Sequence, residues 1–510
     1  MNAPKFLVID LGSQLTLVIG RILRELGYRS AILSPKKAEA WLMSNRPAGI
    51  ILSGGPASVN DPDAPMPPRG IWASNVPILG ICYGMQVIAR EIGGVVSPSL
   101  TYKHYGPTEI KVDNKDRIFV GLGTFQCVWM SHGDSVHDLP KANVITIGTA
   151  GDTIAAIRCL RAPWWGLQFH PEAVETSDGR QMLENFVGGI CQGKKDWSPP
   201  DVITEIRSRA EHDCADLNVL GGFSGGVDSS ALLRILAPVM GKKLRAVCID
   251  GGQLRLGELE EIERHAKDIG VSLKIVSAQD RFLDALGGIS NNGEGKRQAF
   301  RGVYKAILEE EARDFGAGAI LQGSLATDFI ESGQHGGSGS DMIKTHHNIG
   351  LGLSFPELHP FKDLFKYEVR ELARTLGLPA SISERQPFPG PGLFIRIIGG
   401  EITSQRLDLL RWADAKVTEI LRNGGVYSEM AQLVVALLCT PTVGVKGDGR
   451  SYSPSFIVRG VKTSDYMTAS GYQIPAEVRR LISQEVTKHP DVVRVFFDET
   501  DKPPATTEME

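Results

Sequence analysis

The sequence has few cysteines, and they form no arrangement that could build a scaffold. Seven Cys are scattered over 510 residues, and no two of them form a Cys-x-x-Cys pair. Such a set argues against a disulfide framework and against a cysteine zinc site. The chain also lacks an apolar run of about 18 residues, and a strand-like segment, 6–9, stands where a signal sequence would be cationic and then apolar. We therefore expect a cytoplasmic protein with no membrane partner.

A strong charge of either sign is missing as well. The 55 Lys and Arg residues stand against 59 Asp and Glu residues, which gives a formal net charge of −4. No basic field is available to attract nucleic acid, so we expect no nucleic-acid partner and small-molecule substrates whose charges are met by local groups. The length suffices for roughly two to four domains with cores of their own.

A glycine- and serine-rich loop lies between a predicted strand at 217–221 and a predicted helix. Glycine lets backbone N–H groups turn toward an anion, and the N-terminus of the following helix adds partial positive charge. The loop lacks the Gly-Lys-Ser/Thr ending of a Walker-type loop and resembles that of the ATP pyrophosphatases. The plainer alternative is a strand-to-helix turn without a ligand. The predicted ATP-binding residues are Ser224, Gly225, Gly226, Val227, Asp228, Ser229 and Ser230, with Asp228 as the Mg²⁺ ligand.

Cys82 occupies a second junction between a predicted strand, 77–81, and a helical pattern. Small residues on both sides, in Gly-x-Cys-x-Gly, allow the sharp turn of a nucleophile elbow, and the helix N-terminus favours a thiolate. A Cys nucleophile needs a base and a group that orients the base. His170 and Glu172, at the end of another strand-like segment, meet both needs. The alternative is an inert buried cysteine and a structural histidine.

Three segments around these residues, 80–86, 130–134 and 168–172, resemble the class I glutamine amidotransferases, and 53–56 resembles their oxyanion loop. The resemblance implies that Cys82 attacks the side-chain amide of glutamine, His170 shuttles protons and Glu172 holds the imidazole. Backbone N–H groups would stabilise the oxyanion, each donor contributing roughly 3 kcal/mol. The implied oxyanion and glutamine-binding residues are Gly54, Tyr83, Gln86, Ser131 and His132.

The order of the two segments in one chain resembles the glutamine-hydrolysing GMP synthetase family over nearly the full length, and 385–393, 444–450 and 502–510 extend the match. The resemblance implies that ATP, with Mg²⁺, adenylates xanthosine monophosphate (XMP), and that ammonia from glutamine then converts it to GMP in a homodimer. Strand-like runs that alternate with helical periods predict α/β architecture with parallel sheets. The expected domains are two doubly wound α/β domains, 1–195 (amidotransferase) and 196–385 (ATP pyrophosphatase), and an α+β dimerisation domain, 386–510.

Further residue roles come from the resemblance. It implies that Arg297, Arg450, Lys502 and Glu508 hold XMP, because cations can pair with a phosphate and a carboxylate can read a purine edge. A Gly- and Ser-rich segment, 332–340, is expected to form a lid. The candidates there for ATP contact, Mg²⁺ contact or adenylation are Asp328, Glu331, Lys344, His346 and His347, with Lys362 and Lys366 as cations that meet phosphate charge.

The match to the family has departures. The chain has Asp250-Gly-Gly252 where Asp-Asn-Gly is usual, and it ends in Thr507-Glu-Met-Glu510 where Ile-Glu-Trp-Glu is typical. Two alternatives therefore stay open: an amidotransferase-coupled adenylating ligase that acts on another acceptor, and a weakly active regulatory nucleotide-binding paralogue. Formation of AMP and pyrophosphate in the presence of XMP separates the three hypotheses.

Overall fold

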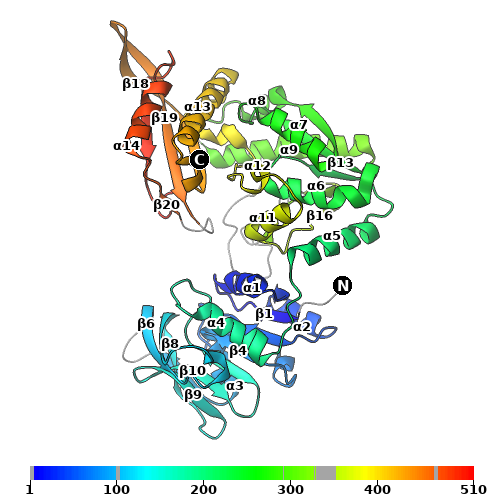
Figure 1. Ribbon diagram of the computed structural model, residues 1–510, viewed down its shortest axis with the longest axis vertical. Helices are drawn as coiled ribbons and strands as arrows, with labels where there is room; N and C mark the ends of the chain where they lie inside the picture. The colour runs from blue at the N-terminus through cyan, green and yellow to red at the C-terminus, as the bar shows by residue number, and fades with distance from the viewer. Residues whose placement is uncertain (1–4, 99–103, 291, 327, 329–351, 464–468) are drawn as a thin grey trace. The chain divides into compact units, whose positions relative to one another are not determined.

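The computed structural model describes residues 5–98, 104–290, 292–326, 328, 352–463 and 469–510. Contacts divide the chain into two compact units, one that ends at Val202 and one that begins at Ile203 (Figure 1). The division into three domains expected from the sequence stays a prediction. Helix α5 (Pro199–Asp213) crosses the division between the two units.

The first unit is built on a nine-stranded sheet with the order β2-β1-β3-β4-β11-β10-β9-β6-β7. The pairs from β2 to β11 are parallel, and those from β11 to β7 are antiparallel. The sequence analysis predicted β1, β4 and the strand-like segment before His170, which is β11, but not the antiparallel half. The strands are β1 (Phe6–Ile9), β2 (Ser30–Leu33), β3 (Gly49–Leu52), β4 (Ile78–Ile81), β6 (His104–Val112), β7 (Phe125–His132), β9 (Val144–Ala150), β10 (Thr153–Cys159) and β11 (Trp164–Leu167).

The inner parallel strands of this sheet, β1, β3, β4 and β11, are buried on both faces. Along β1, Phe6 and Val8 join one hydrophobic cluster, and Leu7 and Ile9 join another. Successive side chains of a strand point to opposite faces, so an uninterrupted apolar run is what a strand covered on both sides requires. The covering and flanking elements are α1 (Thr16–Glu25), α2 (Pro35–Leu42), α3 (Tyr83–Glu91), α4 (Gly179–Glu184) with a π-helical extension (Asn185–Ile190), and the small sheet of β5 (Val95–Pro98) and β8 (Asp134–Asp138).

The second unit begins with a five-stranded, all-parallel sheet in the order β14-β13-β12-β15-β16. β12 lies between β13 and β15, so the chain turns to opposite sides of it, and the carboxyl end of such a strand is where open α/β sheets bind ligands. The elements are β12 (Val219–Gly222), β13 (Leu244–Asp250), β14 (Ser272–Ser277), β15 (Ala319–Leu321), β16 (Glu357–Leu358), α6 (Val227–Met240), α7 (Glu258–Ile269), α8 (Gln279–Leu286), α9 (Gly293–Phe315), α11 (Lys366–Thr375) and α12 (Ala380–Ser383).

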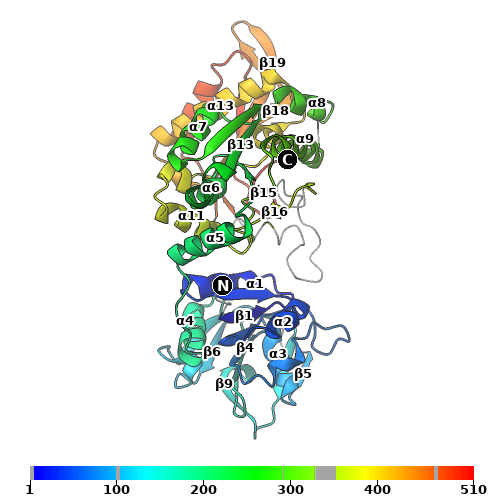
Figure 2. The ribbon, with the colours of Figure 1, turned by 90° about the vertical axis from the view of Figure 1, so that its right-hand side faces the viewer.

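The C-terminal part of the second unit is α+β, as the sequence predicted. Its long hairpin of β18 and β19 projects away from the remaining elements of this unit (Figures 1 and 2). One hydrophobic cluster includes Leu220 of β12, Phe300 of α9 and Val435 of β18, so both sheets of the unit share a core. The elements are β17 (Ile397–Ile398), α13 (Ser404–Asn423), β18 (Gln432–Lys446), β19 (Gly449–Lys462), β20 (Ser470–Gly471), α14 (Ala476–Val486) and β21 (Arg494–Asp498).

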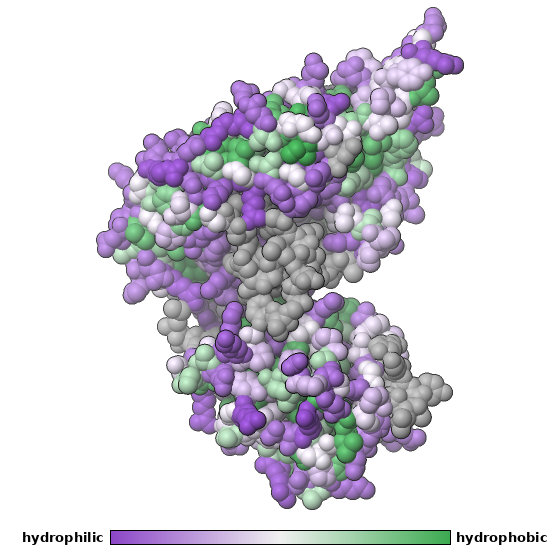
Figure 3. All heavy atoms as spheres, turned by 180° about the vertical axis from the view of Figure 1, so that it is seen from behind, coloured by the Kyte–Doolittle hydropathy of each residue, from purple (hydrophilic) through white to green (hydrophobic). Residues whose placement is uncertain are grey.

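The described part of the chain has no helix with both the length and the apolar character needed to cross a membrane. The face drawn in Figure 3 is largely hydrophilic, with apolar residues in patches between polar ones. The large apolar side chains lie mostly in the buried clusters.

Candidate active sites

Cys82 lies in a strained turn between β4 and α3. Its backbone has φ 50° and ψ −103°, a conformation that a non-glycine residue adopts at a cost of about 1–3 kcal/mol. The glycines beside it allow three backbone segments to meet. A Cβ atom on Gly80 would lie 2.4 Å from the carbonyl oxygen of Gly84, and one on Gly84 would lie 2.4 Å from that of Leu52. The Gly-x-Cys-x-Gly pattern is therefore a steric requirement of this turn.

His170 and Glu172 form a buried pair just after β11. Nδ1 of His170 donates to Oε1 of Glu172 at 2.8 Å, and the side chains are only 8% and 0% exposed. The Thr176 hydroxyl donates to the His170 carbonyl oxygen at 2.6 Å and holds the backbone of the pair. Because Nδ1 of His170 is hydrogen-bonded to Glu172, Nε2 is the ring nitrogen that is available to Cys82.

The same hydrogen bonds control the charge of the imidazole. Burial by itself lowers the pKa of His170, but hydrogen bonds to Cys82 and Glu172 outweigh it and raise this pKa to about 10. At neutral pH an imidazolium therefore stands between the sulfur of Cys82 and the carboxylate of Glu172. That arrangement keeps a proton ready for a leaving group.

Two further groups contact the cysteine sulfur. Sγ of Cys82 lies 3.6 Å from the carbonyl oxygen of Ser131 and 3.8 Å from Nε2 of Gln168. Ser131 therefore contributes its backbone. Gln168 was not among the predicted site residues, although it lies in the same segment as His170 and its position next to that motif was the available signal.

The other predicted glutamine-site residues line the same turn, and several are engaged in structural contacts. Gly54 lies against His170, because a Cβ atom on Gly54 would be 3.0 Å from Cε1 of the imidazole. Gln86 Nε2 and His132 Nδ1 both lie within hydrogen-bond distance of the Asp134 carbonyl oxygen, at 3.0 and 2.9 Å. These two side chains thus tie α3 and β7 to the start of β8.

Tyr83 is buried, and its hydroxyl donates to the Pro65 carbonyl oxygen at 2.9 Å. Burial raises its pKa to about 12, so the phenol stays neutral. With its side chain engaged in this way, Tyr83 can serve an oxyanion through its backbone N–H.

A second site lies at the carboxyl end of β12, where residues 223–226 lead into α6. Gly225 has φ +69°, and a Cβ atom there would lie 2.6 Å from Cγ1 of Ile262, so both the backbone and the space require glycine. The Ser224 oxygen accepts from the Gly226 N–H at 3.4 Å, and the Ser229 hydroxyl donates to the Gly226 carbonyl oxygen at 3.2 Å. These contacts shape the loop for an anion.

Two predicted members of the loop point into the protein. Val227 is 3% exposed and Ser230 is fully buried within α6. The Ser230 hydroxyl has no hydrogen-bond partner among the described residues. The side chains of Ser224 and Ser229 are accordingly the better placed phosphate donors.

Asp228, in the first turn of α6, faces a lysine from a distant helix. Lys366 Nζ, in α11, donates to Oδ2 of Asp228 at 2.6 Å. Oδ1 is buried and has no partner among the residues that the structure describes. A carboxylate with one uncommitted oxygen beside a phosphate loop fits a Mg²⁺ ligand. No group of three or more His, Cys, Asp or Glu side chains that could hold a metal ion occurs within the described ranges.

The remaining lid candidates are only partly described. Oδ2 of Asp328 accepts from the Leu325 N–H at 2.8 Å, and Lys362 is exposed. Sequence reasoning missed Arg385, whose Nη1 donates to the Gly225 carbonyl oxygen at 2.9 Å and whose guanidinium pairs with Glu258. The predicted residues Glu331, Lys344, His346 and His347 lie outside the described residues.

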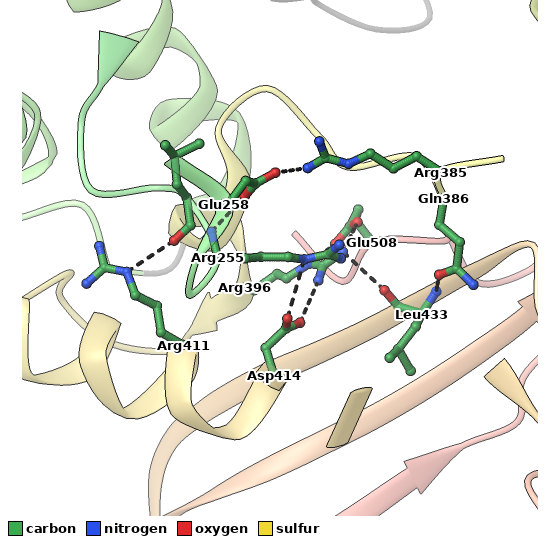
Figure 4. Close-up of polar contacts among 10 residues, drawn as sticks. Arg255, Glu258, Arg385, Gln386, Arg396, Arg411, Asp414, Leu433 and Glu508 are labelled. Carbon is green, nitrogen blue, oxygen red and sulfur yellow. Dashed lines mark hydrogen bonds and ion pairs between the residues drawn. The ribbon is translucent and has the colours of Figure 1, made fainter. Parts of the chain in front are cut away.

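Three of the four predicted XMP residues belong to, or contact, the C-terminal tail. The Glu508 carboxylate accepts from Arg396 (Figure 4). It also accepts from Nε2 of Gln432. Arg297 donates to the Glu510 carbonyl oxygen, and the backbone of Lys502 pairs with that of Ala469 at 2.7 and 3.0 Å.

Arg450 is not brought to this group within one chain. It is exposed at the tip of the β18–β19 hairpin, where it pairs with Val445. Gln432, next to Glu508, begins β18, and a strand of this length places the two ends about 40 Å apart.

Comparison with known proteins adds the family. The model for class I glutamine amidotransferases matches residues 7–189, and the model for the GMP synthase C-terminal domain matches residues 419–509. A glutamine-hydrolysing GMP synthase of Thermus thermophilus is 42% identical over 99% of this chain and 100% of its own length. Those of Thermobifida fusca and Treponema denticola are each 40% identical over 99% of this chain and 97% of theirs.

The chain belongs to the glutamine-hydrolysing GMP synthase family. The resemblance that the motifs indicated is thereby confirmed, and it extends over the whole chain, including the tail that departs from the usual pattern. Within this family, the Cys82 turn falls inside the amidotransferase match, and the tail with Glu508 falls inside the C-terminal match.

Substitution of Gly84 by alanine tests the steric requirement at the Cys82 turn. The added Cβ would meet the Leu52 carbonyl oxygen, so α3 must shift and carry Cys82 with it. We expect glutamine hydrolysis, measured as glutamate release, to fall roughly 100-fold, as misplacement by about 1 Å can produce. The control is Gly70→Ala, since nothing lies within 4 Å of a Cβ atom there. Unchanged hydrolysis in Gly84→Ala would contradict the steric argument.

Stability measured against pH tests the charge of His170. A histidine whose folded-state pKa is about 10 stabilises the fold fully below its ordinary value of about 6.5, and this contribution is lost as pH rises through about 10. We expect the difference in thermal midpoint between the unmodified protein and His170→Asn to be largest in acid and to shrink toward alkaline pH. His137→Asn, which removes an exposed imidazole of the same unit, is the control. A difference that does not vary with pH would rule out this charge state.

Proposed function

We propose that this chain makes GMP from XMP, using ATP and the amide nitrogen of glutamine. ATP adenylates the C2 oxygen of XMP, pyrophosphate leaves, and ammonia released at Cys82 then displaces AMP. The observation that carries the proposal is the presence of two separate sites in one chain of this family. The Cys82, His170 and Glu172 set lies in the first unit, and the phosphate loop with Asp228 and Lys366 lies in the second.

The first site supports cysteine-based amide hydrolysis. The Cys82 sulfur attacks the side-chain carbonyl carbon of glutamine, and His170 gives its Nε2 proton to the leaving nitrogen, which departs as ammonia. Backbone N–H groups near Gly54 and Tyr83 receive the developing oxyanion. Water, deprotonated by His170, then cleaves the thioester to release glutamate. Throughout, Glu172 keeps the imidazole in one orientation through its 2.8 Å hydrogen bond.

The second site supports adenylation. The loop with Ser224 and Ser229 would receive the β- and γ-phosphates of ATP at the N-terminus of α6, and Lys366 would neutralise phosphate charge. Asp228 would hold Mg²⁺ through its uncommitted oxygen. Bound there, the ion would stabilise the negative charge of the departing pyrophosphate. Arg385 stabilises the loop by donating a hydrogen bond to the Gly225 carbonyl oxygen.

We also propose that Arg297, Lys502 and Glu508 bind XMP and that the protein acts as a cytoplasmic homodimer. If Arg450 contacts XMP, it must do so in a second copy, because its hairpin tip lies far from Glu508 of its own chain. The hairpin and its neighbour strand expose the apolar side chains of Val443, Val445, Tyr452 and Phe496, which suits a surface that another copy covers. The seven free thiols agree with a reducing compartment.

Replacement of Cys82 by alanine tests whether the two sites are separate. We expect GMP formation from glutamine to fall by roughly a thousandfold or more, because the nucleophile is gone. GMP formation from added ammonium should stay near the original rate, because the phosphate loop belongs to the other unit. Cys159→Ala, at another buried cysteine of the first unit, is the control. Equal loss with both nitrogen sources would contradict the two-site proposal.

The same ammonium assay tests the acceptor. XMP should stimulate formation of AMP and pyrophosphate. Stimulation by a different acceptor, and not by XMP, would support the alternative ligase. The differences from the family pattern at Gly251 and in the C-terminal tail favour that alternative. Formation of neither product would support a regulatory paralogue.

Asp228→Asn tests the proposed Mg²⁺ ligand. The amide keeps the shape of the side chain but loses its charge, so we expect GMP synthesis from either nitrogen source to fall at least about tenfold and the Mg²⁺ requirement to rise. Glutamine hydrolysis measured alone should continue. The control is Asp268→Asn, at an exposed position of α7. An unchanged Mg²⁺ dependence would show that the ion is held elsewhere.

A further inference from the structure

The carboxylate proposed to read the purine is held by a buried guanidinium. Arg396, at the end of the 3₁₀ segment Gly392–Arg396, is 0% exposed. Its Nη2 and Nε donate to the two carboxylate oxygens of Glu508 at 2.9 and 3.1 Å. Figure 4 shows the two side chains approaching from distant parts of the chain, and they are 112 residues apart in sequence. Such a two-point contact fixes both the position and the plane of a carboxylate.

Arg396 is in turn fixed on its other sides. Its Nη1 lies 3.5 Å from Oδ1 of Asp414, in α13, and its Nη2 also donates to the Leu433 carbonyl oxygen, in β18, at 3.4 Å. The guanidinium lies 4.9 Å from the ring centre of Phe388. Arg255 stacks on the same ring at 4.2 Å and pairs with the other oxygen of Asp414. A planar group held on this many sides can present its donors in one orientation.

The hydrogen bonds of Glu508 leave room for one more donor. A carboxylate has about four acceptor positions, two on each oxygen. Arg396 occupies one on each oxygen, and Gln432 Nε2 occupies the second on Oε1 at 2.8 Å. No donor among the residues that the structure describes takes the position that remains, which is on Oε2. The Glu508 side chain is 13% exposed, whereas the Arg396 side chain is fully buried. A ligand N–H can therefore reach the carboxylate but not the guanidinium.

We propose that Arg396 is a positioning residue of the XMP site, which acts by orienting Glu508 so that Oε2 accepts an N–H of the purine. This inference rests on the proposed function, in which Glu508 contacts XMP. A buried ion pair is weak evidence for a stabilising role, because apolar side chains often replace one at little cost in stability. A fixed carboxylate plane, by contrast, affects affinity directly, because the ligand need not order it on binding.

The chain offers a matched control. Arg459, in β19, is also 0% exposed and donates to a carboxylate near the C-terminus, Oδ2 of Asp498 in β21, at 2.9 Å. Asp498 has no proposed contact with XMP. Substitution of either arginine by lysine keeps one positive charge and removes the planar fork, so a general effect of disturbing a buried pair would appear in both variants.

The test uses the full chain in four forms besides the original: Arg396→Lys, Arg459→Lys, Glu508→Gln and the double variant Arg396→Lys with Glu508→Gln. XMP affinity is measured by titration calorimetry, and kcat and KM for XMP and ATP are measured with ammonium as nitrogen source. We expect Arg396→Lys to weaken XMP binding about tenfold, with kcat at saturating XMP and KM for ATP nearly unchanged. Arg459→Lys should leave XMP affinity unchanged.

The double variant shows whether Arg396 acts through Glu508. If it does, adding Arg396→Lys to Glu508→Gln should weaken XMP binding by no more than about twofold further, because the two effects are coupled. Effects that multiply would overturn the inference. Should Arg396→Lys fail to fold, Asp414→Asn, which removes one support of Arg396, decides the matter: a raised KM for XMP supports the inference and an unchanged one overturns it.

The outcomes separate this inference from the proposed function. Weakened XMP binding in Glu508→Gln together with normal binding in Arg396→Lys overturns the role of Arg396 and leaves the XMP site in place. Unchanged XMP binding in Glu508→Gln removes Glu508 from the XMP site, and the inference about Arg396 falls with it.

Discussion

Both candidate sites depend on a turn from a parallel strand into a helix that is too tight for ordinary side chains. After β4, Gly80 and Gly84 let the chain pass within contact of its own backbone and of β3, and Cys82 takes up a positive φ between them. After β12, Gly225 turns with a positive φ against Ile262. In each case the turn brings a helix N-terminus, with its partial positive charge, to the place where a negative group must be held. We propose that this group is the Cys82 sulfur at the first turn and a nucleotide phosphate at the second.

At each site, a charged partner then fixes the orientation of a candidate functional side chain. Glu172 holds the imidazole of His170 so that the other nitrogen serves sulfur, and Lys366 holds one oxygen of Asp228 and leaves the other uncommitted. Arg396 does the same for Glu508. In all three pairs, one partner is a residue that we propose contacts a substrate or Mg²⁺, and the other holds that residue in place. Buried or half-buried pairs suit this purpose because the surrounding protein, and not water, decides where their atoms lie.

The second unit joins its two sheets through one hydrophobic core. Phe300 of α9 contacts Phe394, with ring centres 6.3 Å apart, and Phe394 belongs to the same 3₁₀ segment as Arg396. The Leu393 N–H donates to the Gln253 carbonyl oxygen at 3.0 Å, in the loop that follows β13. Packing of this kind fixes the C-terminal sheet and its tail against the sheet that carries the phosphate loop. In the proposed reaction, ATP at the loop and XMP near the tail must be held at a set distance, which this shared packing would provide.

Local sequence determined much of this protein. The residues of the Cys82 turn, the His170 and Glu172 pair and the phosphate loop could be found because each depends on a few neighbouring residues whose spacing a strand-to-helix turn dictates. Apolar runs located the central parallel strands such as β1, β4 and β12, whose side chains are mostly buried. The antiparallel strands β6, β7, β9 and β10 were not predicted, because a strand with one exposed face alternates apolar and polar residues and gives a weaker sequence signal than an apolar run.

Only the tertiary structure decided which distant residues meet. Lys366 reaches Asp228 across 138 positions, Arg396 reaches Glu508 across 112, and Gln168 reaches Cys82 across 86. The resemblance also implied that Arg450 joins Glu508 in binding XMP, but the length of the β18–β19 hairpin places Arg450 about 40 Å away. A pattern within a short segment cannot predict these contacts, because they follow from the order of the strands in each sheet and from hydrophobic cores to which residues far apart in each unit contribute.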